Sequence, residues 1–167
     1  MRLYEVPSRL VEFLILAAMQ MIFCSGAWAQ GPNDLAILNG RIGELYNVGK
    51  YSEAIPLAEK SLALTRSRVG DDHPDIAERM GWLAFLYEIQ GRYLEAEPLF
   101  KRSLTIELKT FGPDHPHIVA ALNNLALLYK HQGRLAEAEP LYRQSLALRE
   151  KAFGPDHPEV GAALNNL

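Results

Sequence analysis

Cysteine is almost absent from this chain of 167 residues, since Cys24 is its single cysteine. Cys24 lies within residues 1–29, which we interpret below as a cleaved leader, so the rest of the chain has no thiol. A disulfide framework is therefore excluded, and an exported chain without disulfides must be held together by packing. Phe23 stands where a lipoprotein attachment site needs a small residue, which excludes that use of Cys24.

An excess of charge of one sign is also missing. The chain has 17 lysine and arginine residues against 20 aspartate and glutamate residues, for a net charge of −3. This balance predicts neither a nucleic-acid binder nor a polybasic membrane binder. The sequence also has no glycine-rich loop of the kind that cradles phosphates.

Only one long apolar run occurs, from Phe13 to Cys24, and its twelve residues are too few to span about 30 Å of hydrocarbon. Arg2 and Arg9 precede the run, and a small-x-small triplet that ends at Ala29 follows it. This order is typical of a secretory signal peptide cleaved between Ala29 and Gln30. We therefore expect an exported protein, periplasmic or secreted, with no membrane contact after cleavage.

What the chain does contain is one pattern repeated at a fixed step of 42 in residue number, the repeat period. Single glycines, alanines, prolines and serines recur at this period, and the last four residues copy residues 122–125. Self-similarity at a fixed period indicates stacked units in place of a single central core. The recurring positions are Gly49, Gly91 and Gly133; Ala54, Ala96 and Ala138; Pro56, Pro98 and Pro140; Ser61, Ser103 and Ser145; and Gly70, Gly112 and Gly154.

Each unit has the pattern of two helices joined by a tight turn, and the third copy shows this most clearly. Apolar residues from Ile118 to Tyr129 follow steps of three and four, which place them on one helical face. A turn around Gly133 ends this helix, and a second apolar stripe runs from Ala138 to Phe153. The alternation typical of strands is absent, so we predict an all-α fold. The aromatic residues expected in its core are Tyr87, Phe100, Tyr129 and Tyr142.

The connector between units carries its own helix stop and start signals. Gly154 suits the left-handed position after a helix, and Pro155 cannot continue one. Pro158 suits a first helical turn, and the carboxylate of Asp156 is expected to cap the free N–H groups there.

These residues resemble the tetratricopeptide repeat. The spacing Leu-x-x-Leu-Ala-x-x-Tyr, followed by Gly-x-x-x-Glu-Ala and a further Tyr, is similar to that family from about Leu38 to Leu167. The period of 42 and the connector Phe-Gly-Pro-Asp-His-Pro resemble the kinesin-light-chain type of repeat, which bacteria also carry. The resemblance implies an α–α superhelix, a solenoid of stacked antiparallel helix hairpins, here expected in a bacterial secreted form.

The pattern also predicts where the units begin and end. Tyr46 lies three residues before Gly49, whereas the later tyrosines lie four before their glycines, so the first repeat is expected to be an atypical capping repeat whose first helix is one residue short. The fourth copy has only begun at Leu167, so we expect the natural protein to continue, and its open face could support self-association. The expected units are a signal peptide at 1–29, a lead-in at 30–37, repeats at 38–79, 80–121 and 122–163, and the start of a fourth repeat at 164–167.

Catalytic and metal-binding constellations are not evident in this pattern. The repeated His73, His115 and His157 lie in successive connectors, too far apart to share one ion when packed helices are about 8–10 Å apart. The recurring serines have no repeated histidine within a helical turn to act as a base. We therefore expect no enzyme activity, no metal and no cofactor.

The resemblance implies a binding surface, because the first helices of tetratricopeptide units line a concave groove. Asparagine amides in such a groove can both donate to and accept from the backbone of an extended peptide. The alternative is that these asparagines are solvated surface residues. Carried over position by position, the peptide-binding candidates are Trp82, Phe85, Glu88, Asn123, Asn124, Leu127, Lys130 and His131.

Two hypotheses from different classes follow. The first is a non-catalytic scaffold that binds a peptide or a protein segment in the groove, with no role for nucleic acid. The alternative is a docking or regulatory arm of a larger enzyme whose catalytic domain lies beyond residue 167. The reading frame after residue 167 would distinguish the two.

Overall fold

The computed structural model describes residues 34–165, which form helices joined by short connectors, with no strand in this range. The predicted signal peptide and its Ala29–Gln30 cleavage site lie outside the described residues. The described residues from 37 onward belong to one compact unit, to which the following description applies. The helices are α2 (Asp34–Asn47), α3 (Tyr51–Val69), α4 (Pro74–Ile89), α5 (Tyr93–Phe111), α6 (Ile118–His131), α7 (Leu135–Phe153) and α8 (Pro158–Leu164).

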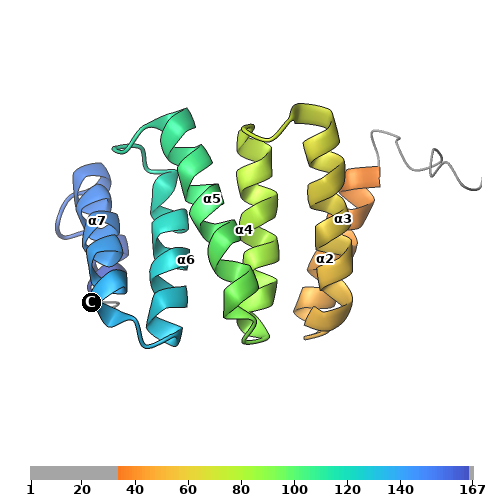
Figure 1. Cartoon of the computed structure of the whole chain (residues 1–167). Helices are drawn as coiled ribbons and strands as arrows, with labels where there is room; N and C mark the ends of the chain where they lie inside the picture. The colour runs from red at the N-terminus through yellow and green to blue at the C-terminus, as the bar shows by residue number, and fades with distance from the viewer. Residues whose placement is uncertain (1–33, 166–167) are drawn as a thin grey trace, which may run out of the picture. The chain divides into compact units, whose positions relative to one another are not determined.

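The helices are stacked in chain order, and Figure 1 shows α3 to α7 standing side by side. Each helix from α3 onward packs against the next one, which makes antiparallel hairpins of α4 with α5 and of α6 with α7. In addition α4 contacts α6, so the first helices of neighbouring repeats lie together on one face of the stack. The predicted all-α solenoid of helix hairpins is confirmed.

Small residues at the recurring positions let these helices approach closely. The alanines and serines that recur at the repeat period in the second helices are all buried. Tyr87, Phe100, Tyr129 and Tyr142 are buried too, which confirms their assignment to the core. The core is therefore a continuous strip that crosses every repeat boundary, as stacked units require.

The turn inside each hairpin has the same geometry in every repeat. Gly133 adopts a φ of 74°, a left-handed value that favours glycine, and the two earlier turn glycines adopt φ values of 74° and 70°. After this glycine, the Arg134 amide donates to the Tyr129 carbonyl at 2.8 Å. The equivalent bond in the first repeat joins the Lys50 amide to the Leu45 carbonyl, also at 2.8 Å.

This geometry corrects the expectation that the first helix of repeat 1 is one residue short. Helix α2 ends at Asn47, which lies one full period before the end of α4 at Ile89. Leu45 is buried in the place that Tyr87 takes one repeat later, and Tyr46 takes the position of Glu88. The two tyrosines occupy different positions of the repeat, so counting from tyrosine to glycine misaligned the first unit.

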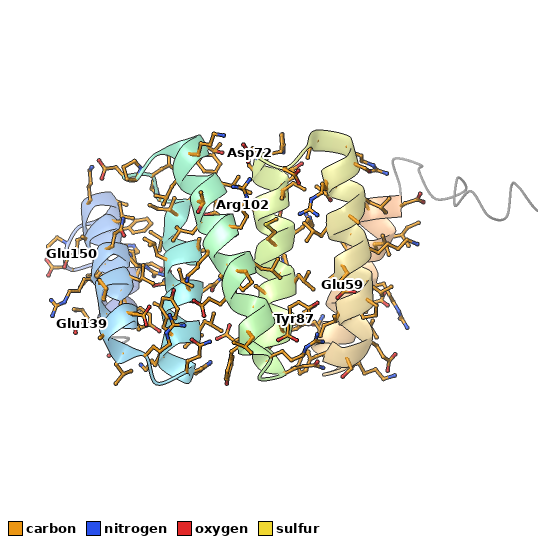
Figure 2. All side chains as sticks on the ribbon, viewed as in Figure 1. Glu59, Asp72, Tyr87, Arg102, Glu139 and Glu150 are labelled. Carbon is orange, nitrogen blue, oxygen red and sulfur yellow. The ribbon has the colours of Figure 1, made fainter. Side chains whose placement is uncertain are left out.

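The connectors also differ from the prediction, because a histidine caps the helix in place of an aspartate. His157 Nδ1 accepts a hydrogen bond from the Glu159 amide at 3.2 Å, so the cap of α8 is His157 and not Asp156. His73 caps α4 in the same way. In the first connector, Asp72 does not cap the helix, and its carboxylate binds Arg102 and Lys109 of α5. Figure 2 shows Asp72 beside Arg102.

A tyrosine–glutamate hydrogen bond joins neighbouring repeats. The Tyr87 hydroxyl of α4 donates to Glu59 of α3 at 2.6 Å (Figure 2), and the Tyr129 hydroxyl of α6 lies 3.5 Å from Glu97 of α5. Burial, followed by the bond to Glu59, raises the pKa of Tyr87 to about 12. The two glutamates occupy different positions of the repeat, so sequence periodicity did not reveal this contact.

Glu97 makes more polar contacts than Glu59. It accepts from Arg134 at 2.7 Å and pairs with Lys101 at 2.6 Å, while the Arg134 guanidinium lies 4.1 Å from the centre of the Tyr129 ring. The hydrogen bonds from Arg134 and Lys101 lower the pKa of Glu97 to about 2. An arginine of repeat 3 is thus held by a carboxylate of repeat 2.

The substitution Glu97→Gln is expected to lower the free energy of unfolding by about 2 kcal/mol at pH 7, because a hydrogen bond to a charged group contributes about 1.5–3 kcal/mol. The pKa of Glu97 is lowered on folding from 4.5 to about 2. Its stabilising effect is therefore complete above pH 4.5 and is lost as the pH falls toward 2. Urea denaturation at about pH 7 and at about pH 3.5 measures this difference.

Glu139→Gln is the matched control, since Glu139 occupies the same position one repeat later and pairs with Arg143 of its own helix at 2.7 Å. An exposed pair within one helix contributes less than about 0.5 kcal/mol. Equal losses from the two substitutions would contradict a special role for Glu97 at the repeat junction.

Candidate binding groove

Residues of the first helices α2, α4 and α6 and of the second helices α3 and α5 line the candidate groove, which contains two pockets. An aromatic cluster of Tyr46, Tyr51, Trp82 and Phe85 lies on this face. The Tyr46 ring centre lies 6.0 Å from that of Trp82 and 5.8 Å from that of Phe85. Trp82 is 40% exposed although it is a large apolar side chain, so the cluster presents an aromatic surface to a ligand.

Two pockets open along this face, one on each side of Trp82. The N-terminal pocket has a volume of about 200 Å³ and the central pocket about 370 Å³. The N-terminal pocket is lined by Asn39, Ile42, Gly43, Ala58, Ser61, Arg79 and Trp82. The central pocket is lined by Ala77, Glu78, Gly81, Trp82, Phe85, Phe100, Ser103, Glu107, Ala120, Ala121 and Asn124.

The two pockets are the same site in consecutive repeats. Ser61 in one and Ser103 in the other are one period apart, and so are Arg79 and Ala121. The pockets differ in charge, because the N-terminal pocket contains an arginine and the central pocket contains two glutamates. The repeated architecture therefore presents two chemically different positions in one groove.

The predicted asparagines of α6, Asn123 and Asn124, are half-buried. Within the described part of the chain, the side chains of Asn123 and Asn124 make no hydrogen bond. Asn124 lines the central pocket, whereas Asn123 lines neither pocket described above. Both amides are thus available to a ligand. By contrast, Asn39, the residue equivalent to Asn123 in repeat 1, already accepts a bond from Ser61 at 2.7 Å.

Three further predicted residues lie near the end of α6. Leu127 is half-buried, and Lys130 is exposed with its Nζ 5.8 Å from the centre of the Tyr142 ring. His131 is half-exposed and its Nδ1 lies 3.0 Å from Glu88 Oε1. His131 therefore contacts Glu88, whereas the charged side chain of Lys130 is exposed to solvent.

Glu88 was predicted to face a ligand, and this prediction is wrong. The residue is only 5% exposed, because His131 of the next repeat lies over its carboxylate. Neither carboxylate oxygen accepts a well-aligned hydrogen bond from the described residues. Burial raises the pKa of Glu88, and the smaller effect of His131 lowers it. Glu88 is thus a buried acid at the junction of α4 and α6, out of reach of a bound peptide.

Glu88→Gln is expected to stabilise the protein by about 1 kcal/mol at pH 8, because it removes a buried charge that has no well-aligned hydrogen bond from the described residues. The pKa of Glu88 is raised in the folded chain, so its ionisation costs stability as the pH rises through that value. The gain should therefore shrink toward zero at about pH 4. Thermal unfolding of both proteins across this range measures it.

Glu150→Gln is the control for this prediction, since Glu150 is exposed on α7 (Figure 2). Its substitution should change the unfolding temperature little, because exposed surface side chains contribute little to stability. A protein destabilised by Glu88→Gln at pH 8 would show that the pair with His131 outweighs the cost of burial.

Sequence reasoning missed Tyr46 and Glu107 as groove residues. Tyr46 would have been found by aligning repeats on the turn glycine, which places it at the position of Glu88 and Lys130. Gly81 stands where repeat 1 has Asn39 and repeat 3 has Asn123, so repeat 2 departs from the pattern at this groove position.

The repeated histidines are engaged in the connectors. His115 and His117 stack on Phe111 with ring centres 5.1 and 4.7 Å away, and His157 stacks on Phe153. Between residues 34 and 165 the structure shows no group of three or more His, Cys, Asp or Glu side chains that could hold a metal ion. In the same range, every helix is too short or too polar to cross a membrane.

Comparison with protein families places these helix pairs among known repeats. One tetratricopeptide-repeat model matches residues 79–151 and 117–167, and a second matches residues 44–75. No curated protein matches this chain.

Solved structures share the same arrangement of helices. The repeats of a Podosopora anserina protein described as a kinesin light chain match with a TM-score of 0.71 and 27% identity over 80% of this chain and 64% of theirs. A singly substituted form of those repeats matches with a TM-score of 0.73 and 26% identity over 88% and 69%. BtubC from P. vanneervenii, at 19% identity and a TM-score of 0.67 over 91% of this chain, shares the fold. The chain spans 64% of the first structure's length and 59% of that of BtubC.

Proposed function

Because the chain belongs to the tetratricopeptide-repeat family, we propose that it is a non-catalytic scaffold that binds an extended segment of another protein in the groove of α2, α4 and α6. Proteins built from these repeats generally act as protein–protein interaction scaffolds. Export through the predicted signal peptide is part of the proposal, and it places the partner in the periplasm or outside the cell.

The observation that carries this proposal is the exposed aromatic cluster between two open pockets. Tryptophan and tyrosine contribute most to interfaces when they fill or border pockets, because they bury a large area with few rotatable bonds. Trp82 borders both pockets, and Tyr46 and Phe85 support it from two helices. A segment that crosses the groove would cover Trp82 and reach the free amides of α6 beyond it.

Trp82→Ala is expected to weaken peptide binding at least tenfold while leaving the fold intact, because its side chain is already 40% exposed. Dodecamer peptides selected on the full chain from a random library provide the ligands, and fluorescence anisotropy measures their affinity.

Leu94→Ala is the matched control, since Leu94 is a large apolar residue that is 86% exposed and lines neither pocket. It should leave affinity unchanged. Peptides that bind Trp82→Ala as tightly as the unaltered chain would contradict binding in the groove.

The double substitution Asn123→Ala with Asn124→Ala tests the amides. We expect a further loss of about fivefold to tenfold for peptides with different side chains, since amides that bond a peptide backbone do not depend on its sequence. The same anisotropy measurement checks this. Unchanged affinity would show that the two asparagines are solvated surface residues with no part in binding.

A further inference from the structure

The central pocket contains a carboxylate, Glu107, that forms no ion pair with another residue of the range 34–165. In repeat 3, Arg149 lies 2.6 Å from Glu159 and the pair is complete. In repeat 2 the acidic and basic positions are exchanged, with Glu107 in place of Arg149 and His117 in place of Glu159. His117 stacks on Phe111, 4.7 Å between ring centres, and forms no ion pair with Glu107 within residues 34–165.

Glu107 has one hydrogen-bonding neighbour in the described part of the chain. The Ser103 hydroxyl lies 3.3 Å from its Oε1, and this hydroxyl also donates to the Ala77 carbonyl at 2.8 Å. The carboxylate is half-buried, and burial raises the pKa of Glu107 against the smaller opposing effects of Ser103 and His117. A cation from outside the chain would supply the missing charge.

The walls of the pocket suit a flat cation. Trp82 and Phe85 provide aromatic surface, and aromatic faces attract cations within about 6 Å. Glu78 adds a second carboxylate, which is shared with Arg79 at 3.0 Å. Among the residues that line this pocket there is no lysine, arginine or histidine.

Gly81 leaves the pocket open. A Cβ atom at this position would point toward Ser103 and meet its Oγ at 3.8 Å, an ordinary contact. Repeats 1 and 3 have asparagine there, so repeat 2 lacks a side chain at the wall of the larger of the two pockets. The pocket therefore combines space, aromatic surface and an uncompensated negative charge.

We propose that the central pocket binds the guanidinium group of an arginine side chain carried by the segment in the groove. This deepens the proposed function and rests on it. Arginine fits better than lysine, because its planar group can stack on Trp82 while it donates two bonds to one carboxylate. The N-terminal pocket, which contains Arg79, does not accept a cation and serves as an internal comparison.

The test uses the pentapeptide Ac-Gly-Ser-Arg-Ser-Gly-NH2 and its forms with citrulline or lysine at the centre. Citrulline has the shape of arginine without the charge. Titration into the full ¹⁵N-labelled chain is followed through the indole N–H signal of Trp82, which Trp28→Phe distinguishes from the other tryptophan. We expect saturable shifts with arginine, at least fivefold weaker binding of citrulline, and intermediate binding of lysine.

Glu107→Gln keeps the shape of the side chain and should reduce arginine affinity at least fivefold without changing citrulline affinity. Gly81→Asn, which restores the residue of repeats 1 and 3, should abolish the shifts of both peptides. Glu150→Gln is the control and should change neither. Equal affinity for arginine and citrulline, or unchanged arginine affinity in Glu107→Gln, would overturn the proposal.

This outcome is separable from that of the proposed function. If library peptides bind in a Trp82-dependent way without a preference for arginine, the groove function stands and the arginine pocket is wrong. If the pentapeptide binds but the library yields no ligand, the pocket stands and the groove function is wrong.

Discussion

The structure depends on one constraint, which is that no hairpin can cover its own apolar face. Each pair of helices buries that face against the next pair, so the core is one strip that continues through every repeat. Because the same packing is needed at each step, alanines, serines and turn glycines recur at the repeat period. Positions outside this strip are not constrained by core packing, and at these positions the repeats differ in residue type.

Polar contacts fix how one repeat sits on the next. The hydroxyls of Tyr87 and Tyr129 each reach back to a glutamate of the preceding repeat, and Arg134 reaches from its turn to Glu97. These contacts lie at the edge of the packed strip, where a salt bridge is partly shielded from water without the full desolvation cost of deep burial. Core packing thus stabilises the stack, and these hydrogen bonds and ion pairs fix the position of each repeat on the preceding one.

Much of the fold could be predicted, because helical periodicity and glycine turns act locally and repeat. The buried Tyr87 and Phe100 followed from the apolar stripe alone. The cap on α8 was assigned to Asp156 when it belongs to His157, because both side chains can accept the same bond. Glu88 was misplaced for a different reason: its burial depends on His131 of another repeat, which no pattern within one helix reveals.

The candidate site follows from exceptions to the repeat, and such exceptions are visible in the sequence only after the register is known. Gly81 and Glu107 differ from their counterparts in repeats 1 and 3, and together they open and charge one pocket. Trp82 is a wall of this pocket and of the neighbouring one. If a residue bound in one pocket rotates the Trp82 indole, the shape of the neighbouring pocket changes as well. Two adjacent residues of a partner, one in each pocket, would then affect each other's binding, and their contributions to affinity would not be additive.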